Sequence, residues 1–359
     1  MDRETLSNYG WITIVTLVLV VLLTLATPFG TYISNGIISV SRGYNAVAEK
    51  KMSEENLNKT QAKFESVIKT NKDAEDTTKP SGALIPTGAT YTKADGTTLE
   101  GNGTNKFPDA PETGDTYEYG DYIYTYNAGS DYGTEWSVLA IANNKTSYGE
   151  ILSKIAGKPV TNMFYTFDDC KFLTTTPVIP NSITDMCLTF NDCTSLTVAP
   201  KIPSSVTNMY GTFGGCTSLT TAPEIPNGVT DISYTFSYCA SLTTVSAIPN
   251  SVTDMQCTFE YCKSLTTVPT IPNSVTNMSA TFQGCTSLIT VPAIPNSVTN
   301  MRGTFQYCTS LAGTIEINAN PSIYDNCFNS TVKSIVLTGS STKLTELAAS
   351  ATNSNVTVK

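Results

Sequence analysis

The sequence predicts a hydrophobic N-terminal helix, either transmembrane or simply long, joined to a solenoid of parallel β-structure with short helical turns. Two observations support this fold class. Residues 11–26 contain no charged side chain, and the apolar stretch continues to residue 33. Between residues 158 and 312, phenylalanine, cysteine and leucine each recur every 23 residues. Self-similarity at a fixed period of this length indicates stacked turns, each of which covers the apolar edge of its neighbour.

The apolar segment 11–33 is long enough to cross a membrane. Its 23 residues match the ~20 that a helix needs to span the hydrocarbon core. Trp11 and Tyr32 stand near its two ends, where aromatic side chains favour the membrane interface. We therefore predict a single-pass transmembrane helix within residues 1–33, with the membrane as a partner. The alternative is a helix buried in a soluble core.

Two segments of different composition follow this helix. Residues 34–78 are polar and rich in helix formers, which predicts a polar helical stalk. Residues 79–114 are rich in Pro, Gly and Thr, which predicts a turn-rich linker or a small irregular β segment.

Residues 115–157 predict a β-rich N-terminal cap over the first repeat. Tyrosines alternate with polar residues between 116 and 126, the period of a half-buried strand. Residues 136–142 predict a second strand and residues 148–157 a short helix. The acidic residues that alternate with the tyrosines are expected on the solvent side of the strand.

Seven repeats occupy residues 158–312. Met or Ile precedes each Phe by four residues, and Leu follows each Cys by three. The expected repeat core contains one Phe and one Cys from every turn: Phe167, Cys170, Phe190, Cys193, Phe213, Cys216, Phe236, Cys239, Phe259, Cys262, Phe282, Cys285, Phe305 and Cys308. The pattern decays over residues 313–359, which predicts a C-terminal cap, because an open solenoid edge would aggregate.

The repeat unit reads I-P-N-S-V-T-N-M-x-x-T-F-x-x-C-x-S-L-T-T-V-P. It resembles the leucine-rich repeats of the BspA-like type, which are found in bacterial and protozoan surface proteins. The resemblance implies a leucine-rich repeat solenoid, with a short parallel strand near the Leu and a short helical turn near the Phe and Cys. It also implies adhesion or ligand binding at a cell surface, with the repeats extracellular. The Met before Thr-Phe departs from the family pattern and changes the volume of the core.

Composition excludes several classes of function. The chain has no histidine, so it lacks a Ser-His-Asp or Cys-His catalytic pair and an imidazole metal site. A net charge of −9 argues against a nucleic-acid partner, which needs a basic surface. We predict no enzyme activity, no cofactor and no metal. The recurring cysteines are interpreted as small buried thiols that fill the core, because stacked side chains pointing the same way make a disulfide torsion awkward.

The informative residues are those that vary between the recurring ones. Repeating a scaffold while changing the side chains on one face builds an extended binding surface, and tyrosine is a frequent anchor in interfaces. The alternative is packing of amphipathic tyrosines along the edge of the solenoid. The candidate binding residues are Tyr165, Tyr210, Tyr234, Tyr238, Tyr261, Arg302 and Tyr307.

We therefore predict a membrane-anchored, surface-displayed protein that binds an extracellular protein or glycan. One observation conflicts with this orientation: Lys and Arg are more frequent after segment 11–33 than before it, which favours a cytoplasmic C-terminal side. The alternative is a filament subunit resembling type IV pilins, in which the N-terminal helices of several copies pack together. A proline near the end of the apolar helix supports that resemblance, whereas Val15 stands where the family's glutamate is expected after processing at Gly10.

Overall fold

The computed structural model describes residues 78–79, 82–130, 133–351 and 355–359. The predicted helix at 1–33 and the predicted stalk, apart from Thr78, lie outside these residues, so both stay predictions. Among the residues that are described, no helix is long and apolar enough to span a membrane. All described elements belong to one compact unit, Thr70–Lys359.

The N-terminal part of this unit is an eight-stranded sheet. Its strand order is β1-β7-β8-β6-β5-β4-β2-β3, with β1 parallel to β7, β6 parallel to β8 and the other neighbours antiparallel. Large aromatic side chains fill its core, among them Tyr117, Tyr124 and Trp136. The strands are β1 (Thr78–Lys79), β2 (Thr90–Thr92), β3 (Thr98–Glu100), β4 (Thr116–Tyr119), β5 (Tyr122–Ser130), β6 (Gly133–Ala140), β7 (Lys154–Ile155) and β8 (Lys158–Asn162).

Of the two alternatives predicted for residues 79–114, the structure shows the β segment and not the linker, because β2 and β3 of this sheet lie there. Strand β2 pairs with β4, and the rings of Tyr91 and Phe107 are buried 5.9 Å apart, edge to face. Tyr91 also contacts Trp136 at 6.1 Å. A few large aromatic side chains therefore hold this segment in the sheet core, although its Pro, Gly and Thr content resembles that of a loop.

Two acidic residues that were expected in solvent are buried. Asp115 accepts hydrogen bonds from the Tyr91 hydroxyl and, at 2.8 Å, from the backbone N–H of Ala94. Asp121 pairs with Lys145 at 2.5 Å and accepts from the backbone N–H of Gly149 at 2.7 Å. These carboxylates satisfy loop donors, which offsets the cost of their burial.

The predicted helix at 148–157 is wrong, because this segment contains no helix: its only regular element is the two-residue strand β7, which is followed by β8. Tyr148 is buried, and its ring lies 5.0 Å from that of Phe167, the first phenylalanine of the repeats. Tyr122 contacts the same ring at 6.1 Å. Aromatic packing thus covers the first turn of the solenoid and overrides the helix-forming composition of the segment.

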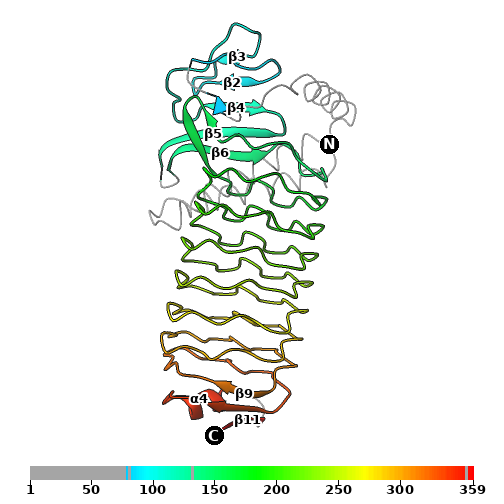
Figure 1. The fold of residues 1–359 in the computed structure, drawn as a ribbon, viewed down its shortest axis with the longest axis vertical. Coiled ribbons are helices and arrows are strands. Elements are labelled where there is room, and N and C mark those ends of the chain that lie inside the picture. The colour runs from blue at the N-terminus through cyan, green and yellow to red at the C-terminus, as the bar shows by residue number, and fades with distance from the viewer. Residues whose placement is uncertain (1–77, 80–81, 131–132, 352–354) are drawn as a thin grey trace, which may run out of the picture. The chain divides into compact units, whose positions relative to one another are not determined.

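The repeats stack one turn on the next, as Figure 1 shows between β6 and β9. A parallel ladder joins Asn162, Asp185, Asn208 and the corresponding residues of later turns as far as Ile323. The repeat phenylalanines from Phe167 to Phe305 stack with centroids 5.2–5.8 Å apart and ring planes within 9° of parallel. All fourteen predicted core residues are buried.

Two details of the expected turn are corrected. The segment from Met to Leu is a series of tight turns and not a helical turn: Thr166, Cys170 and Leu173 each donate their N–H to the carbonyl three residues earlier. The pairing expected near Leu is reduced to isolated bridges such as Val198–Thr221. Residues with positive φ interrupt any helix, and the Pro that follows in most turns removes a ladder donor.

Residues 313–359 continue the stack before ending it. Ile317 pairs with Ile294, and Phe328 stacks on Phe305 at 5.3 Å, so an eighth turn is present. The closing elements are β9 (Gly313–Glu316), β10 (Ile335–Thr338), the short helix α4 (Leu344–Ala349) and β11 (Val356–Val358), and the three strands form a parallel sheet in the order β11-β10-β9.

Candidate functional site

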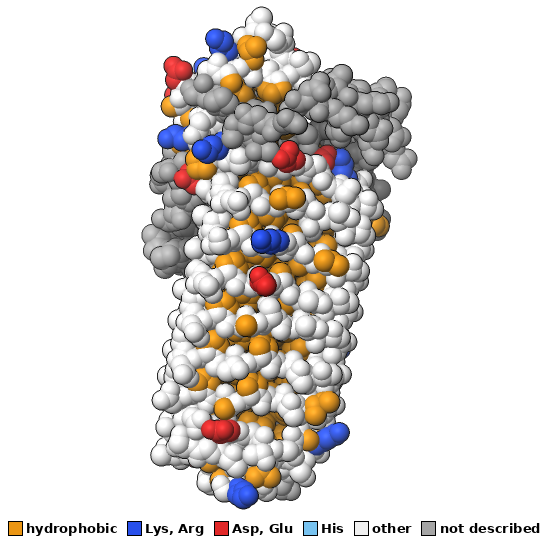
Figure 2. All heavy atoms as spheres, viewed as in Figure 1, with side chains coloured by type: hydrophobic (Ala, Val, Ile, Leu, Met, Phe, Trp, Pro, Cys, Tyr) orange, Lys and Arg blue, Asp and Glu red, His pale blue; other side chains and the backbone are white. Residues whose placement is uncertain are grey.

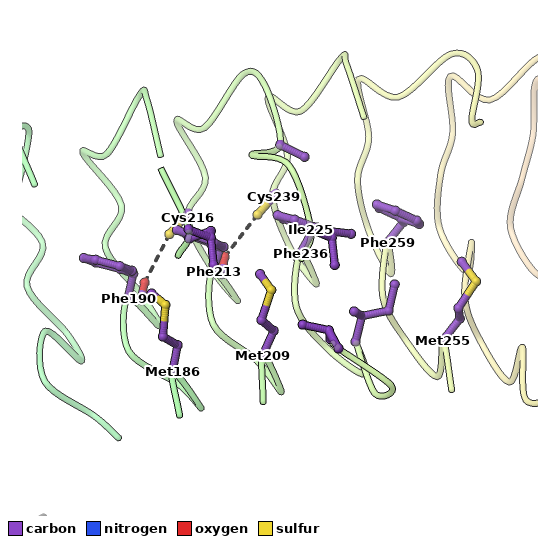
Figure 3. Close-up of a cluster of buried hydrophobic side chains, with 14 of the residues drawn as sticks. Met186, Phe190, Met209, Phe213, Cys216, Ile225, Phe236, Cys239, Met255 and Phe259 are labelled. Atoms are coloured by element: carbon purple, nitrogen blue, oxygen red, sulfur yellow. Dashed lines mark hydrogen bonds between the residues drawn. The ribbon is translucent and has the colours of Figure 1, made fainter. Parts of the chain in front are cut away.

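The recurring polar side chains of the repeat are occupied inside the core. Thr189 Oγ1 donates to the carbonyl of Met163, in the preceding turn, at 2.8 Å. Cys193 Sγ donates to the carbonyl of Phe167, also in the preceding turn, at 3.1 Å. The same thiol-to-carbonyl bond recurs along the stack, and Figure 3 shows it for Cys216 and Cys239. The recurring Thr and Cys therefore hold turns together and are not available to a ligand.

The ten cysteines of the chain are all buried, and none forms a disulfide. Burial raises the pKa of Cys170 to about 11 and that of Cys285 to about 12. The thiols are therefore protonated at neutral pH, as their role as hydrogen-bond donors requires. The described residues contain no group of His, Cys, Asp or Glu that could hold a metal ion.

Each turn has four variable positions between its Met and Cys. We number them from the repeat Phe as −3, −2, +1 and +2, and we call the surface that they form the tyrosine face. Backbone N–H groups at −4, −2, 0 and +2 donate to the next turn, whereas those at −1, +1 and +3 bond within their own turn. For example, the N–H of Tyr238 donates to the carbonyl of Glu260 at 2.7 Å, and that of Cys239 to Phe236 at 3.1 Å.

This alternation is accompanied by a left-handed backbone at −2 and +2 in all seven turns. At −2 the φ angles lie between 52° and 60°, and at +2 between 55° and 72°. Glycine, asparagine and aspartate adopt this region most readily. The residues concerned are Tyr165, Leu188, Gly211, Tyr234, Cys257, Ala280 and Gly303 at −2, and Asp169, Asp192, Gly215, Tyr238, Tyr261, Gly284 and Tyr307 at +2.

Five of the seven candidate binding residues occupy these left-handed positions. They are Tyr165, Tyr234, Tyr238, Tyr261 and Tyr307, with φ between 55° and 61°. A bulky side chain is uncommon there and costs about 1–2 kcal/mol. The sequence analysis did not predict the left-handed backbone, although glycine occurs at the same positions in other turns and is typical of that conformation.

The tyrosines form two rows along the stack. In the row at −3 and −2, the rings of Tyr210 and Tyr234 lie 5.4 Å apart, and Gln256 Nε2 donates to the Tyr234 hydroxyl at 3.1 Å. In the row at +2, Tyr238 and Tyr261 stack at 4.9 Å. Tyr261 then covers Gly284, where an added Cβ would lie 2.5 Å from the Tyr261 ring. Tyr238 remains 53% exposed and Tyr307 43% exposed.

The +1 position, which lies between the −2 and +2 positions in the sequence, holds a polar side chain in six of the seven turns and glycine in the third. Asn191 Nδ2 donates to Asp168 Oδ1 in the preceding turn at 2.9 Å, and Ser237 Oγ donates to Glu260 Oε2 in the following turn at 3.2 Å. Burial raises the pKa of Asp168 to about 6 and also raises that of Glu260. Burial likewise raises the pKa of Tyr165 and of Tyr234 to about 12, so these hydroxyls are neutral at pH 7.

Arg302 lies apart from the main tyrosine cluster. It is exposed at −3 of the seventh turn, the same turn as Tyr307 and four turns beyond Tyr210. Its backbone N–H donates to Asn300 Oδ1 at 3.1 Å. The structure therefore brings Tyr165, Tyr210 and Tyr234 into one row and Tyr238 and Tyr261 into a second, and it places Arg302 and Tyr307 at the C-terminal end.

Another surface of the repeats follows the Leu of each turn. Thr220, Thr243 and Thr266 are exposed there, together with Val198 at 71%. The face seen in Figure 2 carries hydrophobic side chains down the middle of the stack, uncharged polar groups beside them and few charges. The exposed threonines offer control positions away from the tyrosines.

Comparisons with known proteins identify the repeats. A profile described as "BspA type leucine rich repeat region (6 copies)" matches residues 162–280 and 233–356, together more than half of the chain. A search of curated proteins gave no match.

Similar solved structures are leucine-rich repeat proteins. The T. pallidum leucine-rich repeat protein has 23% identity and a TM-score of 0.36, with 55% of this chain and 83% of that chain covered. A leucine-rich repeat protein from Bacteroides ovatus has 20% identity and a TM-score of 0.35, with 67% and 76% covered. A leucine-rich cell surface protein from Faecalibacterium prausnitzii has 18% identity and a TM-score of 0.31, with 70% and 95% covered.

Proposed function

This chain belongs to the BspA-type leucine-rich repeat family, and we propose that it is a surface-displayed binding protein whose tyrosine face contacts an extracellular ligand. Residues 11–33 anchor it in the membrane. Binding requires no cofactor and no catalytic step, because the candidate residues supply aromatic rings, neutral hydroxyl groups and the Arg302 guanidinium.

The observation that carries the proposal is the placement of five tyrosines at left-handed backbone positions. The same positions hold glycine in other turns, for example Gly215 and Gly284, so the fold itself does not need tyrosine there. Backbone strain that is retained where a relaxed residue would fit is typical of functional sites. Tyrosine also offers a large ring with little side-chain entropy to lose on binding.

Binding by the full-length chain to an array of glycans, extracellular matrix proteins and intact cells tests this proposal. We expect wild-type protein to bind and the double variant Tyr238→Asn/Tyr261→Asn to lose binding, because both rings are removed while asparagine accepts the left-handed backbone. The matched control is Thr220→Ala/Thr243→Ala, on the surface after Leu. Equal binding by all three proteins would exclude the tyrosine face.

Display and anchoring need a separate test. Protease added to intact cells that express the full-length chain should cleave the repeats, and the wild-type chain should sediment with membranes. Deletion of residues 11–33 should release the protein. Protection of the repeats from protease would instead place them in the cytoplasm, and regular fibres in electron micrographs of the purified chain would favour the filament alternative over a single anchor.

A further inference from the structure

We infer that the solenoid folds only while its cysteines are reduced, and that the folded stack then protects these thiols from oxidation. This inference goes beyond the proposed function and does not depend on the ligand. Three features of the structure support it: the burial of the thiols, the hydrogen bonds that they donate, and the spacing of neighbouring cysteines along the stack.

The seven repeat cysteines form one row inside the solenoid, which we call the cysteine row. Each of them is at most 1% exposed. Oxidation of a thiol requires contact with an oxidant and begins with the thiolate. Burial prevents this contact, and it also raises the pKa of Cys216, Cys262 and Cys308 well above the ordinary value. The members of the cysteine row are Cys170, Cys193, Cys216, Cys239, Cys262, Cys285 and Cys308.

Six thiols of the cysteine row join one turn to the next. Each Sγ donates to the carbonyl of the repeat Phe in the preceding turn, at 3.0–3.1 Å. The remaining member, Cys170, has its Sγ 3.3 Å from the Tyr148 hydroxyl. A disulfide sulfur carries no proton, so oxidation of any of the six donors removes a hydrogen bond between turns. The reduced thiol is therefore part of the folded structure.

Neighbouring members of the cysteine row are badly placed for a disulfide. Successive turns repeat the same thiol-to-carbonyl bond, so their cysteine side chains point the same way, as Figure 3 shows for Cys216 and Cys239. Their Cβ atoms are then separated by about the distance between turns, about 4.8 Å. A disulfide needs a Cβ separation of about 3.5–4.5 Å and side chains that converge. A bond between two of these cysteines would therefore disturb the stacking of their turns.

The unfolded chain has ten cysteines, none of which has a disulfide partner in the folded state. With glutathione disulfide, one thiolate forms a mixed disulfide and releases a glutathione, and a second cysteine thiolate then attacks the protein sulfur and releases the other glutathione. Two protein thiols are oxidised, and one glutathione disulfide is reduced to two thiols. Neighbours in the cysteine row are 23 residues apart. Because the entropy of loop closure rises slowly with length, many pairs can form, and none of them belongs to the folded structure.

Cys257, outside the cysteine row, provides a matched control. It lies at −2 and is 7% exposed, more than any other cysteine of the chain. Alanine and glycine occupy the same position in other turns, at Ala280 and Gly303. We therefore expect Cys257→Ala to fold, and to leave the effect of oxidation on the cysteine row unchanged.

Cell-free synthesis of the full-length chain in non-ionic detergent tests the inference by changing the order of folding and oxidation. One reaction contains dithiothreitol throughout, and a second contains glutathione disulfide from the start. In a third, dithiothreitol is replaced by glutathione disulfide after synthesis is complete. Limited proteolysis measures folding of the repeats. Labelling with N-ethylmaleimide after denaturation, followed by peptide mapping, shows which thiols are still reduced. Wild type and Cys257→Ala are compared in all three reactions.

We expect the first and third reactions to give protease-resistant repeats with a reduced cysteine row. The second should give chains that are cleaved at least about 100-fold faster, because cleavage of folded repeats requires local opening, and later addition of dithiothreitol should restore resistance. Resistant repeats in the second reaction, failure of dithiothreitol to restore them, or cleavage in dithiothreitol alone would overturn the dependence of folding on reduced thiols. Oxidation of the cysteine row in the third reaction would overturn the protection. Folding of Cys257→Ala but not of wild type in the second reaction would overturn the assignment to the cysteine row.

Discussion

At the scale of one residue, Tyr307 combines a strained backbone with an exposed aromatic ring. Its φ is 61° and its side chain is 43% exposed. The equivalent residue in the preceding turn is Gly284, with φ of 72°. Because one position accepts both residues, the left-handed backbone is a property of the turn. The fold does not require tyrosine at this position, and tyrosine adds backbone strain to the folded state.

Relieving this strain should stabilise the protein. We expect Tyr307→Asn to raise the free energy of unfolding by about 0.5–1 kcal/mol, because asparagine tolerates the left-handed region better than tyrosine. The control is Tyr210→Asn, at a position on the same face without a positive φ, where the ring contact with Tyr234 at 5.4 Å is lost and stability should fall. Urea unfolding monitored by circular dichroism measures both. A loss of stability in Tyr307→Asn would contradict the strain argument.

Asp168 should make stability depend on pH. Burial raises its pKa from the ordinary 3.8 to about 6, so the folded state binds a proton more tightly than the unfolded state. This contribution to stability is full below about pH 4 and is lost as the pH rises through 6. We expect the wild type to gain about 1 kcal/mol more than Asp168→Asn between pH 7 and pH 5. Urea unfolding at the two pH values is the measurement, and identical pH dependence in both proteins would refute the assignment.

At the scale of the element, the turns are joined by parallel rows of Phe, Thr and Cys. Thr281 is fully buried, and its Oγ1 donates to the carbonyl of Met255 at 2.8 Å. Thr276, in the same turn, is exposed, and its Oγ1 donates to the carbonyl of Thr253 at 3.2 Å. Water can replace the second bond but has no access to the first. The two threonines therefore form a matched pair.

We expect Thr281→Val to lower the free energy of unfolding by about 1 kcal/mol, because valine keeps the volume and removes the buried donor. Thr276→Val should change it by less than about 0.5 kcal/mol. Thermal and urea unfolding of the two variants give the comparison. Equal losses of unfolding free energy in the two variants would show that the buried threonine row contributes no more to stability than the exposed row.

At the scale of the whole molecule, each turn contacts its neighbours in nearly the same way. Phe259 stacks at 5.8 Å and 4° on both Phe236 and Phe282. Removing one complete period should therefore let Phe236 stack on Phe282 without a new kind of contact. Stability in such stacks is approximately a sum of nearest-neighbour terms.

Deletion of residues 243–265, which joins Leu242 to Thr266, should give a shorter protein that still unfolds cooperatively. Its urea m-value should be smaller, because less surface is exposed on unfolding. Deletion of residues 243–253 is the control, since removing about half a turn places the next Phe and Cys out of register. The expectation is contradicted if the two deletions disrupt the far-ultraviolet spectrum equally.

The repeat core was predictable because identical turns must bury identical positions. Phe213 and Cys216 sit where the 23-residue period places them, and even the decaying pattern preserves Phe328 over Phe305. In that last turn Cys327 takes the position of the recurring Thr, and Thr331 that of the recurring Cys. The exchange keeps a small, buried side chain at both positions.

The misassignments at the N-terminal end have a different origin. Tyr91 and Phe107 stand isolated among Pro, Gly and Thr residues, and their burial depends on Tyr117 and Trp136, which lie far away in the sequence. Asp115 alternates with tyrosines as a solvent-facing residue would, yet it is buried and accepts hydrogen bonds from Tyr91, Ala94 and Glu112. The burial of these residues depends on tertiary contacts, which the local sequence pattern does not predict.

By itself, the sequence determined the repeat, its period and the side chains of its core. The reason is that a periodic apolar pattern of this length is buried when successive turns stack and each covers the apolar edge of its neighbour. It also identified the tyrosines as variable. Only the tertiary structure showed which of them contact one another across turns, and that five of them occupy left-handed backbone. The reason is that the cross-turn hydrogen bonds set the conformation of each turn, and these bonds exist only once neighbouring turns are stacked.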